Sequence, residues 1–242
     1  MQVRLISKTS GAVGTEYEGR SIDEIIVGKA RISSSREVNE LFDEPYKLLR
    51  HCLLEGHFSI FELGNLGIEI TTSRAMGREL LRHTKQVGVT ELSQRYKQIT
   101  EIEPIELRLQ SKYNRQSSTE VTNDYPLDSL IESIREVYSF LVYQGVARET
   151  ARFILPEATQ TTIIMNFRIR EVITFLNVRL HKTAQKEIRL IAQAIKEIML
   201  QECPIISKAL YNFEYAEEIH ILDRMILEKY KVFGIIKDKI KL

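Results

Sequence analysis

The pattern of hydrophobic and polar positions predicts a chain with many helices and a few strands. Residues 3–6 (Val-Arg-Leu-Ile) look like a short strand. Leu66, Ile68 and Ile70 then alternate with other residues, as expected of a strand with one buried face. Residues 161–165 (Thr-Thr-Ile-Ile-Met) are a third strand candidate.

Helix boundaries are marked by proline, glycine and serine. Pro45 can begin a helix, because its missing N–H falls where helical donors are unpaired, and Gly56 can end it. Ser73 can cap a helix that runs to about Arg82, because its hydroxyl accepts an orphan amide hydrogen. The apolar positions of the 45–56 helix fall on one face: Leu48, Leu49, Cys52 and Leu53.

The second half of the chain reads mainly as helix. Pro126 begins an amphipathic helix that Gly145 ends. Further helices are predicted over 148–155, 168–178 and 183–202, with a charged amphipathic helix beyond Pro204. Residues 105–124 are polar without a clear period, which predicts a long loop or excursion. The fold class expected is α+β: one domain over residues 1–242, rich in helix, with a small, mostly antiparallel sheet.

Composition and charge narrow the classes of protein. The chain has 242 residues, 43% of them hydrophobic and 28% charged, which excludes disordered and fibrous proteins. A formal net charge of +1 gives no general attraction to nucleic acid, so an anionic ligand has to be met by local clusters of cations.

Cysteine usage and the N-terminal residues indicate a cytoplasmic protein. Cys52 and Cys203 lie in no metal-ligand spacing and are expected to be two buried, reduced thiols. The first residues lack the pattern of a signal peptide, and no apolar run reaches the length that spans a membrane.

Residues 82–96 are the richest segment in candidate chemistry. They combine Arg82, His83, Lys85 and Arg95 with a carboxylate and hydroxyls, around a middle near Gly88 that we expect to be a loop. Arginine presents a flat fork to phosphates and carbonyls, and hydroxyls or carboxylates can read the edge of a ring. The segment therefore favours a nucleotide ligand.

Two further arginines stand in apolar surroundings. Arg152 lies in the predicted 148–155 helix, and Arg179 ends the predicted 168–178 helix, where burial is costly unless an anion meets the guanidinium. The alternative for each arginine is a salt bridge to an acidic residue or a solvated position.

Other sequence motifs for binding or catalysis are missing. There is no GxGxxG, GxxxxGK[ST], HExxH or GxSxG. The histidines have no metal-ligand spacing, so no metal site is expected.

These segments taken together resemble the flavin-dependent thymidylate synthases. The resemblance runs from about residue 20 to 205. It rests on Arg82-His83, 91–96 (Glu-Leu-Ser-Gln-Arg-Tyr), 151–156 (Ala-Arg-x-x-Leu-Pro), 175–179 (Phe-Leu-x-x-Arg), 184–189 (Ala-Gln-x-Glu-Ile-Arg), 56–62 (Gly-His-x-x-x-Phe-Glu) and 30–33 (Ala-Arg-Ile-Ser).

The resemblance implies an activity, its cofactors and an assembly. Such enzymes are homotetramers of an α+β fold whose active sites are shared between subunits. They hold FAD, take the carbon from methylenetetrahydrofolate and the reducing equivalents from NADPH, and convert dUMP to dTMP. The implied partners are small molecules and further copies of the chain, with no nucleic acid and no membrane. No cysteine attacks the pyrimidine, in keeping with cysteines that lie outside every motif.

The resemblance also implies roles for particular residues. Arg179 and Ser93 would be catalytic. The residues placed around dUMP would be Glu79, Arg82, Glu91, Ser93, Gln94, Arg95, Arg152 and Arg179. The residues placed around FAD would be Ser33, His57, Arg82, Thr84, Lys85, Glu91, Arg168, Arg170 and Thr174.

The chain departs from the family pattern at several of these positions. Thr84 stands where the pattern has arginine, with Lys85 next to it, and the linker to Ser93 is one residue longer. Glu79 replaces a glutamine that faces the nucleotide, and Arg168 replaces an asparagine. Two alternatives follow: an enzyme that methylates or hydroxymethylates C5 of another pyrimidine nucleotide, or a flavin- or nucleotide-binding homologue without catalysis.

Overall fold

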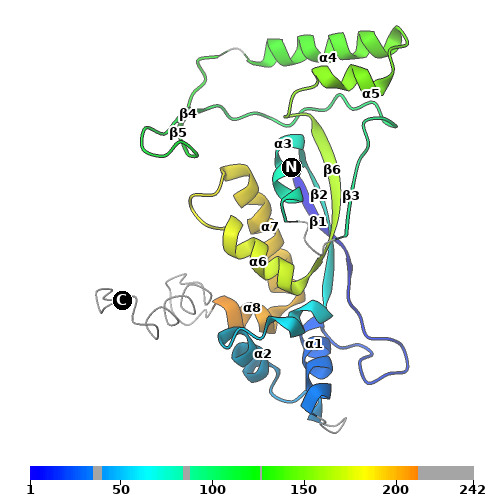
Figure 1. Cartoon of the computed structure of the whole chain (residues 1–242), viewed down its shortest axis with the longest axis vertical. Coiled ribbons are helices and arrows are strands. Elements are labelled where there is room, and N and C mark those ends of the chain that lie inside the picture. Colours follow the sequence, from blue (N-terminus) through cyan, green and yellow to red (C-terminus); the bar gives the residue numbers. More distant parts are fainter. Residues whose placement is uncertain (35–39, 84–87, 126, 212–242) are drawn as a thin grey trace. The chain divides into compact units, whose positions relative to one another are not determined.

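The structure is a computed structural model that describes residues 1–34, 40–83, 88–125 and 127–211 (Figure 1). Helices and short strands alternate along the chain, and the sheet pairs that involve β3 and β4 are antiparallel. The predicted α+β fold, rich in helix with a small antiparallel sheet, is confirmed. None of the described helices is long and apolar enough to cross a membrane.

Contacts between residues divide the chain into two compact units. The first unit consists of Met1–Ile6, Gly67–Asn166 and Val178–Ala194. The second consists of Ser7–Leu66, Phe167–Asn177 and the described residues from Ile195 onward. A single domain over residues 1–242 stays a prediction, and each unit is described by itself below.

The first unit contains most of a four-stranded sheet in the order β1-β2-β6-β3 (Figure 1). The strands are β1 (Gln2–Lys8), β2 (Asn65–Ser73), β6 (Gln160–Arg168) and β3 (Gly88–Glu91). Ile68 and Ile70 of β2 and Ile163 and Met165 of β6 are buried, because side chains two apart share one face of a strand. The three predicted strands are therefore confirmed, with longer bounds.

The helices of the first unit begin at the predicted positions, except that the helix predicted from residue 183 begins at Lys186. They are α3 (Arg74–Leu81), α4 (Leu127–Tyr143), α5 (Arg148–Ala151) with the 3₁₀ helix η4 (Arg152–Ile154), and the first half of α7 (Lys186–Glu202). The Ser73 hydroxyl accepts a hydrogen bond from the Met76 N–H, so the predicted N-cap of α3 is confirmed.

Two segments of the first unit differ from prediction. The middle of residues 82–96 was expected to be a loop, but Gly88 begins β3, which pairs antiparallel with β6. That prediction was wrong because β-branched Val89 and Thr90 favour a strand that a neighbouring strand can pair. Residues 105–124 are not simply irregular, since β4 (Arg108–Gln110) and β5 (Ser118–Val121) form an antiparallel pair within them.

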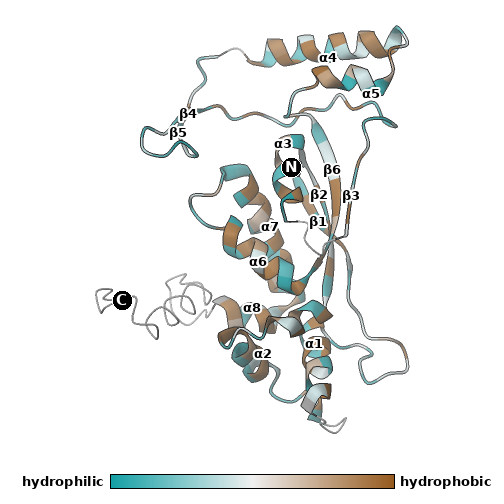
Figure 2. Ribbon diagram, viewed as in Figure 1, coloured by the Kyte–Doolittle hydropathy of each residue, from teal (hydrophilic) through white to brown (hydrophobic). Residues whose placement is uncertain are grey.

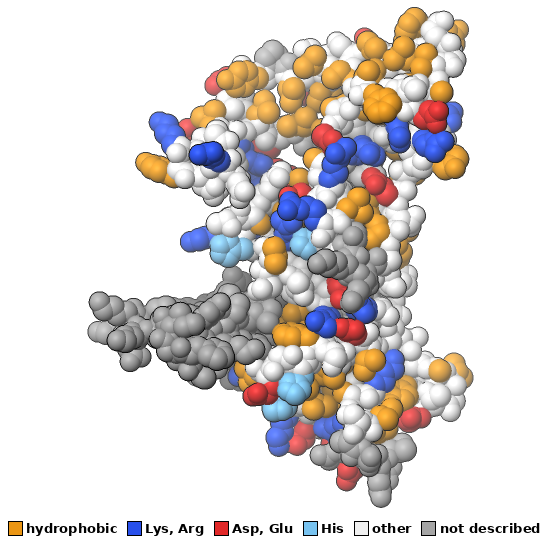
Figure 3. All heavy atoms as spheres, in the orientation of Figure 1, with side chains coloured by type: hydrophobic (Ala, Val, Ile, Leu, Met, Phe, Trp, Pro, Cys, Tyr) orange, Lys and Arg blue, Asp and Glu red, His pale blue; other side chains and the backbone are white. Residues whose placement is uncertain are grey.

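Helix α4 keeps much of its apolar side in contact with solvent. Tyr138 is fully buried, but Leu130, Val137 and Phe140 are each more than half exposed. Figure 2 shows brown, apolar residues along α4, and Figure 3 shows hydrophobic side chains gathered over the α4 and α5 region. Isolated exposed apolar residues are ordinary, whereas grouped ones often belong to interaction surfaces.

The second unit is built from helices. They are α1 (Ile22–Arg31), α2 (Pro45–Leu54), α6 (Ile169–Arg179, through Asn177 in this unit), the second half of α7, and α8 (Pro204–Tyr211), with 3₁₀ helices η1 (Ile32–Ser34) and η3 (Phe58–Leu63). The predicted 45–56 and 168–178 helices are confirmed. The predicted charged helix beyond Pro204 lies mostly outside the described residues, apart from α8.

Helix α1 was missed, although its sequence carries a start signal. The Ser21 hydroxyl accepts a hydrogen bond from Glu24 N–H, and the Glu24 carboxylate accepts one from Ser21 N–H, so the two residues form a capping box. Ile22, Ile25 and Ile26 follow at helical spacing and are buried.

The buried Asp23 side chain holds the start of α8. Its carboxylate accepts hydrogen bonds from Ile205 N–H at 2.9 Å and from Ile206 N–H at 3.1 Å. Burial raises the pKa of this carboxyl to about 6, although the two amide donors favour the charged form. Cys52 and Cys203 are both free and buried, as predicted.

Candidate active site

The first unit gathers four polar side chains around the end of α3. Glu79 and Arg82 lie on or next to α3, His83 follows it, and Arg179 ends α6. The Arg179 Nε–H donates to His83 Nε2 at 2.8 Å, and Arg179 Nη1 lies 3.0 Å from Glu79 Oε2. The Arg179 side chain is only 15% exposed, so the guanidinium is fixed by two neighbours rather than solvated.

The cluster favours the neutral form of His83. Burial lowers the pKa of the imidazole, and the positive charge of Arg179 lowers it further, whereas Glu79 opposes the shift. A neutral imidazole has one nitrogen that can accept a hydrogen bond. Because Arg179 donates to Nε2, the proton of neutral His83 lies on Nδ1.

Arg82 is less tightly held. Its Nη1 lies 3.8 Å from Glu79 Oε1, too far for a hydrogen bond, and its side chain is 73% exposed. Helix α3 ends at this point, with Arg82 as its C-cap, so the guanidinium extends from the helix end. The carboxylate of Glu79 therefore has one guanidinium on each side.

Glu91 is held at the end of β3 by α3 and β6. Its Oε1 accepts a hydrogen bond from the Thr161 hydroxyl at 2.8 Å and lies 3.6 Å from Arg74 Nη1. Gly77 allows this close packing, because a Cβ there would meet Ile163 Cδ1 at 3.0 Å. The Glu91 carboxylate therefore makes a hydrogen bond and an ion pair with residues of its own unit.

The next three predicted residues form a turn after β3. The Ser93 hydroxyl accepts a hydrogen bond from Arg95 N–H at 3.3 Å, which shapes the turn. Gln94 is buried, and its amide nitrogen has no hydrogen-bond partner among the described residues. Arg95 extends outward and pairs with Glu149 at 3.0 Å.

Glu149 joins this turn to α5. Arg152, at the start of η4, donates to the Glu149 carbonyl oxygen at 3.3 Å, and Arg148 donates to the Tyr96 carbonyl oxygen at 3.0 Å. Arg95 and Arg152, separated in sequence, are thus attached to the same residue. Two exposed or partly exposed guanidiniums held at one residue, with Ser93 in the same turn as Arg95, are suited to a phosphate group.

The residues predicted for FAD lie mainly in the second unit. Arg168 donates from Nε to Glu171 at 2.9 Å and from Nη1 to Glu62 at 3.2 Å, and Arg170 also pairs with Glu62. The Arg168 side chain is 22% exposed and that of Arg170 is 44% exposed. Arg170 is therefore the more accessible cation for a ligand's phosphate.

The other FAD residues predicted in the second unit, His57, Ser33 and Thr174, have exposed side chains. Gly56, with φ of 75°, ends α2, and the His57 N–H returns to the Cys52 carbonyl oxygen at 2.8 Å, which leads the exposed His57 into η3. The hydroxyls of Ser33 and Thr174 donate to backbone oxygens of Ala30 and Arg170. Thr84 and Lys85 lie outside the described residues.

Several residues of these clusters were not assigned from sequence. His83 contacts Arg179, Glu149 contacts Arg95, and Glu62 contacts both Arg168 and Arg170. A signal existed for His83, because it lies four residues after Glu79, and residues at that spacing share a helix face. Glu62 also had a signal, because it ends the motif at 56–62, whereas Glu149 had none.

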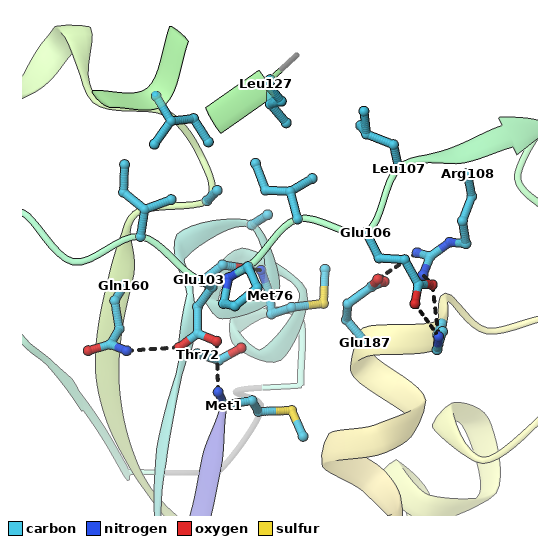
Figure 4. Close-up of a pocket in the computed structure, with 18 of the residues that line it drawn as sticks. Met1, Thr72, Met76, Glu103, Glu106, Leu107, Arg108, Leu127, Gln160 and Glu187 are labelled. Carbon is cyan, nitrogen blue, oxygen red and sulfur yellow. Dashed lines mark hydrogen bonds and ion pairs between the residues drawn. The ribbon is translucent and has the colours of Figure 1, made fainter. Parts of the chain in front are cut away.

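A large pocket lies elsewhere in the first unit (Figure 4). Its volume is about 1530 Å³, and its lining includes Ile105, Val121 and Leu127. Figure 4 shows Glu103 between the Met1 ammonium and the Gln160 amide, and Arg108 beside Glu106 and Glu187. No residue predicted for dUMP or FAD lines this pocket.

An α+β fold with arginines held beside carboxylates is suited to anionic, planar ligands. The model of the thymidylate synthase complementing protein family matches residues 15–205. The chain belongs to this family, the flavin-dependent thymidylate synthases, and is an enzyme of that type.

Individual relatives agree with this assignment. The chain is 36% identical over 217 residues to the flavin-dependent thymidylate synthase of Synechocystis sp., covering 87% of this chain and 99% of the relative. It is 34% identical to a probable flavin-dependent thymidylate synthase of Paramecium bursaria Chlorella virus 1, covering 87% and 99% of the two chains.

A solved structure shares the fold. The UMP/dUMP methylase PolB from Streptomyces cacaoi, bound with 5-Br dUMP, superposes with a TM-score of 0.73 at 22% identity. The match covers 88% of this chain and 95% of that one. At this identity the likeness concerns the fold alone.

Proposed function

We propose that this enzyme converts dUMP to dTMP, with FAD as cofactor, methylenetetrahydrofolate as carbon donor and NADPH as reductant. The observation that carries the proposal is the partly buried Arg179, held between His83 and Glu79 in a chain of this family. A guanidinium fixed in this way can stabilise charge that develops on a pyrimidine carbonyl without having to reorganise.

In this proposal, different residues of the first unit contact different parts of the nucleotide. Arg95, Arg152 and Ser93 bind the phosphate through charge-assisted hydrogen bonds. Arg179 polarises the ring as C5 becomes nucleophilic, and Arg82, Glu79, Glu91 and Gln94 complete the contacts. Since Glu149 already pairs with Arg95, the phosphate has to compete with a surface carboxylate, which costs little.

The second unit offers side chains that fit a dinucleotide in type. Arg170 presents a guanidinium that is 44% exposed, and His57 and Ser33 present exposed polar groups suited to phosphate and ribose. Arg168 and Thr174, with Arg82, Glu91, Thr84 and Lys85, complete the set that we assign to FAD. The flavin supplies the redox chemistry when bound, whereas the protein binds and orients it.

We also propose that the enzyme is a cytoplasmic homotetramer of single-domain subunits with shared active sites. The exposed apolar side of α4 supports this, because a second copy would remove Leu130, Val137 and Phe140 from water. The pocket lined by residues 101–108 has a volume of about 1530 Å³, which exceeds the roughly 300–1,000 Å³ usual for small ligands. A pocket of this volume could hold a segment of a second copy.

Two other functions remain as alternatives. The first is methylation or hydroxymethylation of another pyrimidine nucleotide, favoured by Glu79 in the place of glutamine and by a structural neighbour described as a UMP/dUMP methylase. The second is a flavin- or nucleotide-binding homologue without catalysis, favoured by Thr84 in the place of arginine.

The direct test is turnover by purified protein loaded with FAD. Given dUMP, methylenetetrahydrofolate and NADPH, it should release dTMP, identified by chromatography and mass spectrometry. Reactions that lack one co-substrate are the controls. Absence of dTMP in the complete reaction, from protein that shows flavin absorbance, would rule out the proposed function.

A further inference from the structure

Arg168 is held by carboxylates on two sides. Its Nε and Nη2 donate to the two oxygens of Glu171 at 2.9 Å and 3.2 Å, and its Nη1 donates to Glu62 Oε2 at 3.2 Å. A guanidinium bound to a carboxylate through two parallel hydrogen bonds has a fixed plane. Glu171 therefore orients Arg168, and Arg168 in turn holds one oxygen of Glu62.

Glu62 divides its carboxylate between two arginines. Oε2 accepts the hydrogen bond from Arg168, whereas Oε1 pairs with Arg170 Nη1. The Arg170 side chain is 44% exposed, and its Nε and Nη2 have no partner among the described residues. Because Arg170 receives only one oxygen of Glu62, these two nitrogens keep donors for a ligand.

The charges of this group are balanced. Arg168 and Arg170 oppose Glu62 and Glu171, so the formal sum is zero. Without Arg168 the sum would be negative, and both oxygens of Glu62 would be available to Arg170. An anion would then meet repulsion and would have to displace a two-bond partner from Arg170.

From this arrangement we propose that Arg168 is a positioning residue, which keeps Glu62 from closing on Arg170 and so leaves Arg170 available to the phosphates of FAD. Within the set of residues assigned to FAD, Arg168 acts through Glu62 and not by touching the cofactor. Arginine can stand where the family pattern has asparagine because two carboxylates of the chain bind the added cation. The inference rests on the proposed function, since it takes FAD to be the ligand of Arg170.

Substitutions of Arg168 give the first test. Arg168→Gln removes the positive charge and lets Glu62 turn both oxygens toward Arg170. The Kd for FAD should rise by roughly tenfold, the worth of one hydrogen bond to a charged group. Arg168→Lys keeps a cation between Glu62 and Glu171, so it should stay within about threefold of wild type, although lysine lacks the planar fork.

Glu62→Gln should have the opposite effect. A neutral amide competes less for Arg170 than a carboxylate does, so FAD should bind more tightly than to wild type, by roughly 3- to 10-fold. Adding Arg168→Gln to this variant should change the Kd by less than about twofold, because residues that act through one contact are not additive.

The measurement is equilibrium titration of the full chain with FAD, followed by the change in flavin absorbance. Lys47→Gln is the matched control, because it removes one positive charge from an exposed residue of the second unit that pairs with Glu44. Its Kd for FAD should equal that of wild type. Thermal unfolding reports whether each variant folds, and Glu62→Gln alone decides the question if Arg168→Gln does not.

Each result has a distinct meaning. Weaker or unchanged FAD binding in Glu62→Gln, or the same loss on Arg168→Gln with and without the Glu62 carboxylate, overturns the positioning role. Arg168→Lys that binds FAD as weakly as Arg168→Gln overturns it too. The expected affinities without any dTMP formation overturn the proposed function and leave the positioning role standing. Failure of wild type to bind FAD overturns both.

Discussion

At the scale of single residues, the surroundings of Arg179 constrain the chemistry most. A cation that is only 15% exposed needs compensation, and here a neutral imidazole and a carboxylate provide it. Such a guanidinium is already oriented before a ligand arrives. Its contribution should appear mainly in the transition state, where charge develops.

Arg179→Ala should lower kcat/KM for dUMP by about 100-fold or more, which corresponds to about 3 kcal/mol of lost stabilisation. The assay is steady-state turnover with saturating folate and NADPH. Arg78→Ala is the control, because Arg78 is an exposed arginine on α3 whose partner among the described residues is Glu157. Turnover close to wild type in Arg179→Ala would contradict a role in polarising the ring.

Ser93→Ala tests the phosphate end of the site. The Ser93 hydroxyl is assigned to dUMP, so the KM for dUMP should rise by roughly tenfold, the worth of one charge-assisted hydrogen bond. Binding of FAD, measured from flavin absorbance, should stay unchanged. Ser133→Ala on the exposed side of α4 should alter neither quantity, and a loss of FAD in Ser93→Ala would argue against the assignment.

At the scale of elements, the start of α8 depends on a buried carboxyl. Asp23 of α1 binds the amides of Ile205 and Ile206, and burial raises its pKa to about 6 from a usual 3.8. A carboxyl with a raised folded-state pKa stabilises the fold most below its unfolded pKa. That contribution is lost as the pH rises through about 6, up to about 3 kcal/mol for the full shift.

Asp23→Asn removes this titration. Relative to wild type, the variant should gain stability between pH 4 and pH 7, by up to about 3 kcal/mol. Urea unfolding of both proteins at a series of pH values measures the difference. A constant difference for Asp23→Asn would refute the raised pKa.

At the scale of the whole molecule, α4 presents apolar residues that its own unit leaves in water. Covering such apolar side chains with another surface removes them from water and is favourable. Phe140 is 60% exposed and lies on this side of α4. A second copy of the chain is the occupant that we propose.

Phe140→Glu should therefore shift the proposed tetramer toward smaller species, because it places a charge in the apolar interface that we propose. Light scattering after size-exclusion chromatography measures the mass in solution. Val13→Glu introduces the same charge at a residue that is 87% exposed and should leave the assembly intact. A stable tetramer in Phe140→Glu would remove this face from the interface.

The sequence by itself determined the local structure and the family. Periodicity, Ser73, Pro45 and Gly56 placed most helices and strands, because these signals act over a few residues. The spaced motifs led to the family that the comparisons then showed. Local signals also existed for helix α1, which begins with a capping box, and for strand β3, which contains β-branched residues. These two signals were not recognised from the sequence.

Only the tertiary structure decided which charges meet. His83 and Arg179 lie 96 positions apart, and Asp23 and Ile205 lie 182 apart, so no local pattern links them. Ion pairs depend on distance in space, and any of the 33 acidic residues was an equal candidate partner for each arginine. The tertiary fold places the Glu79 carboxylate beside the guanidinium of Arg179, with the guanidinium of Arg82 near its other oxygen.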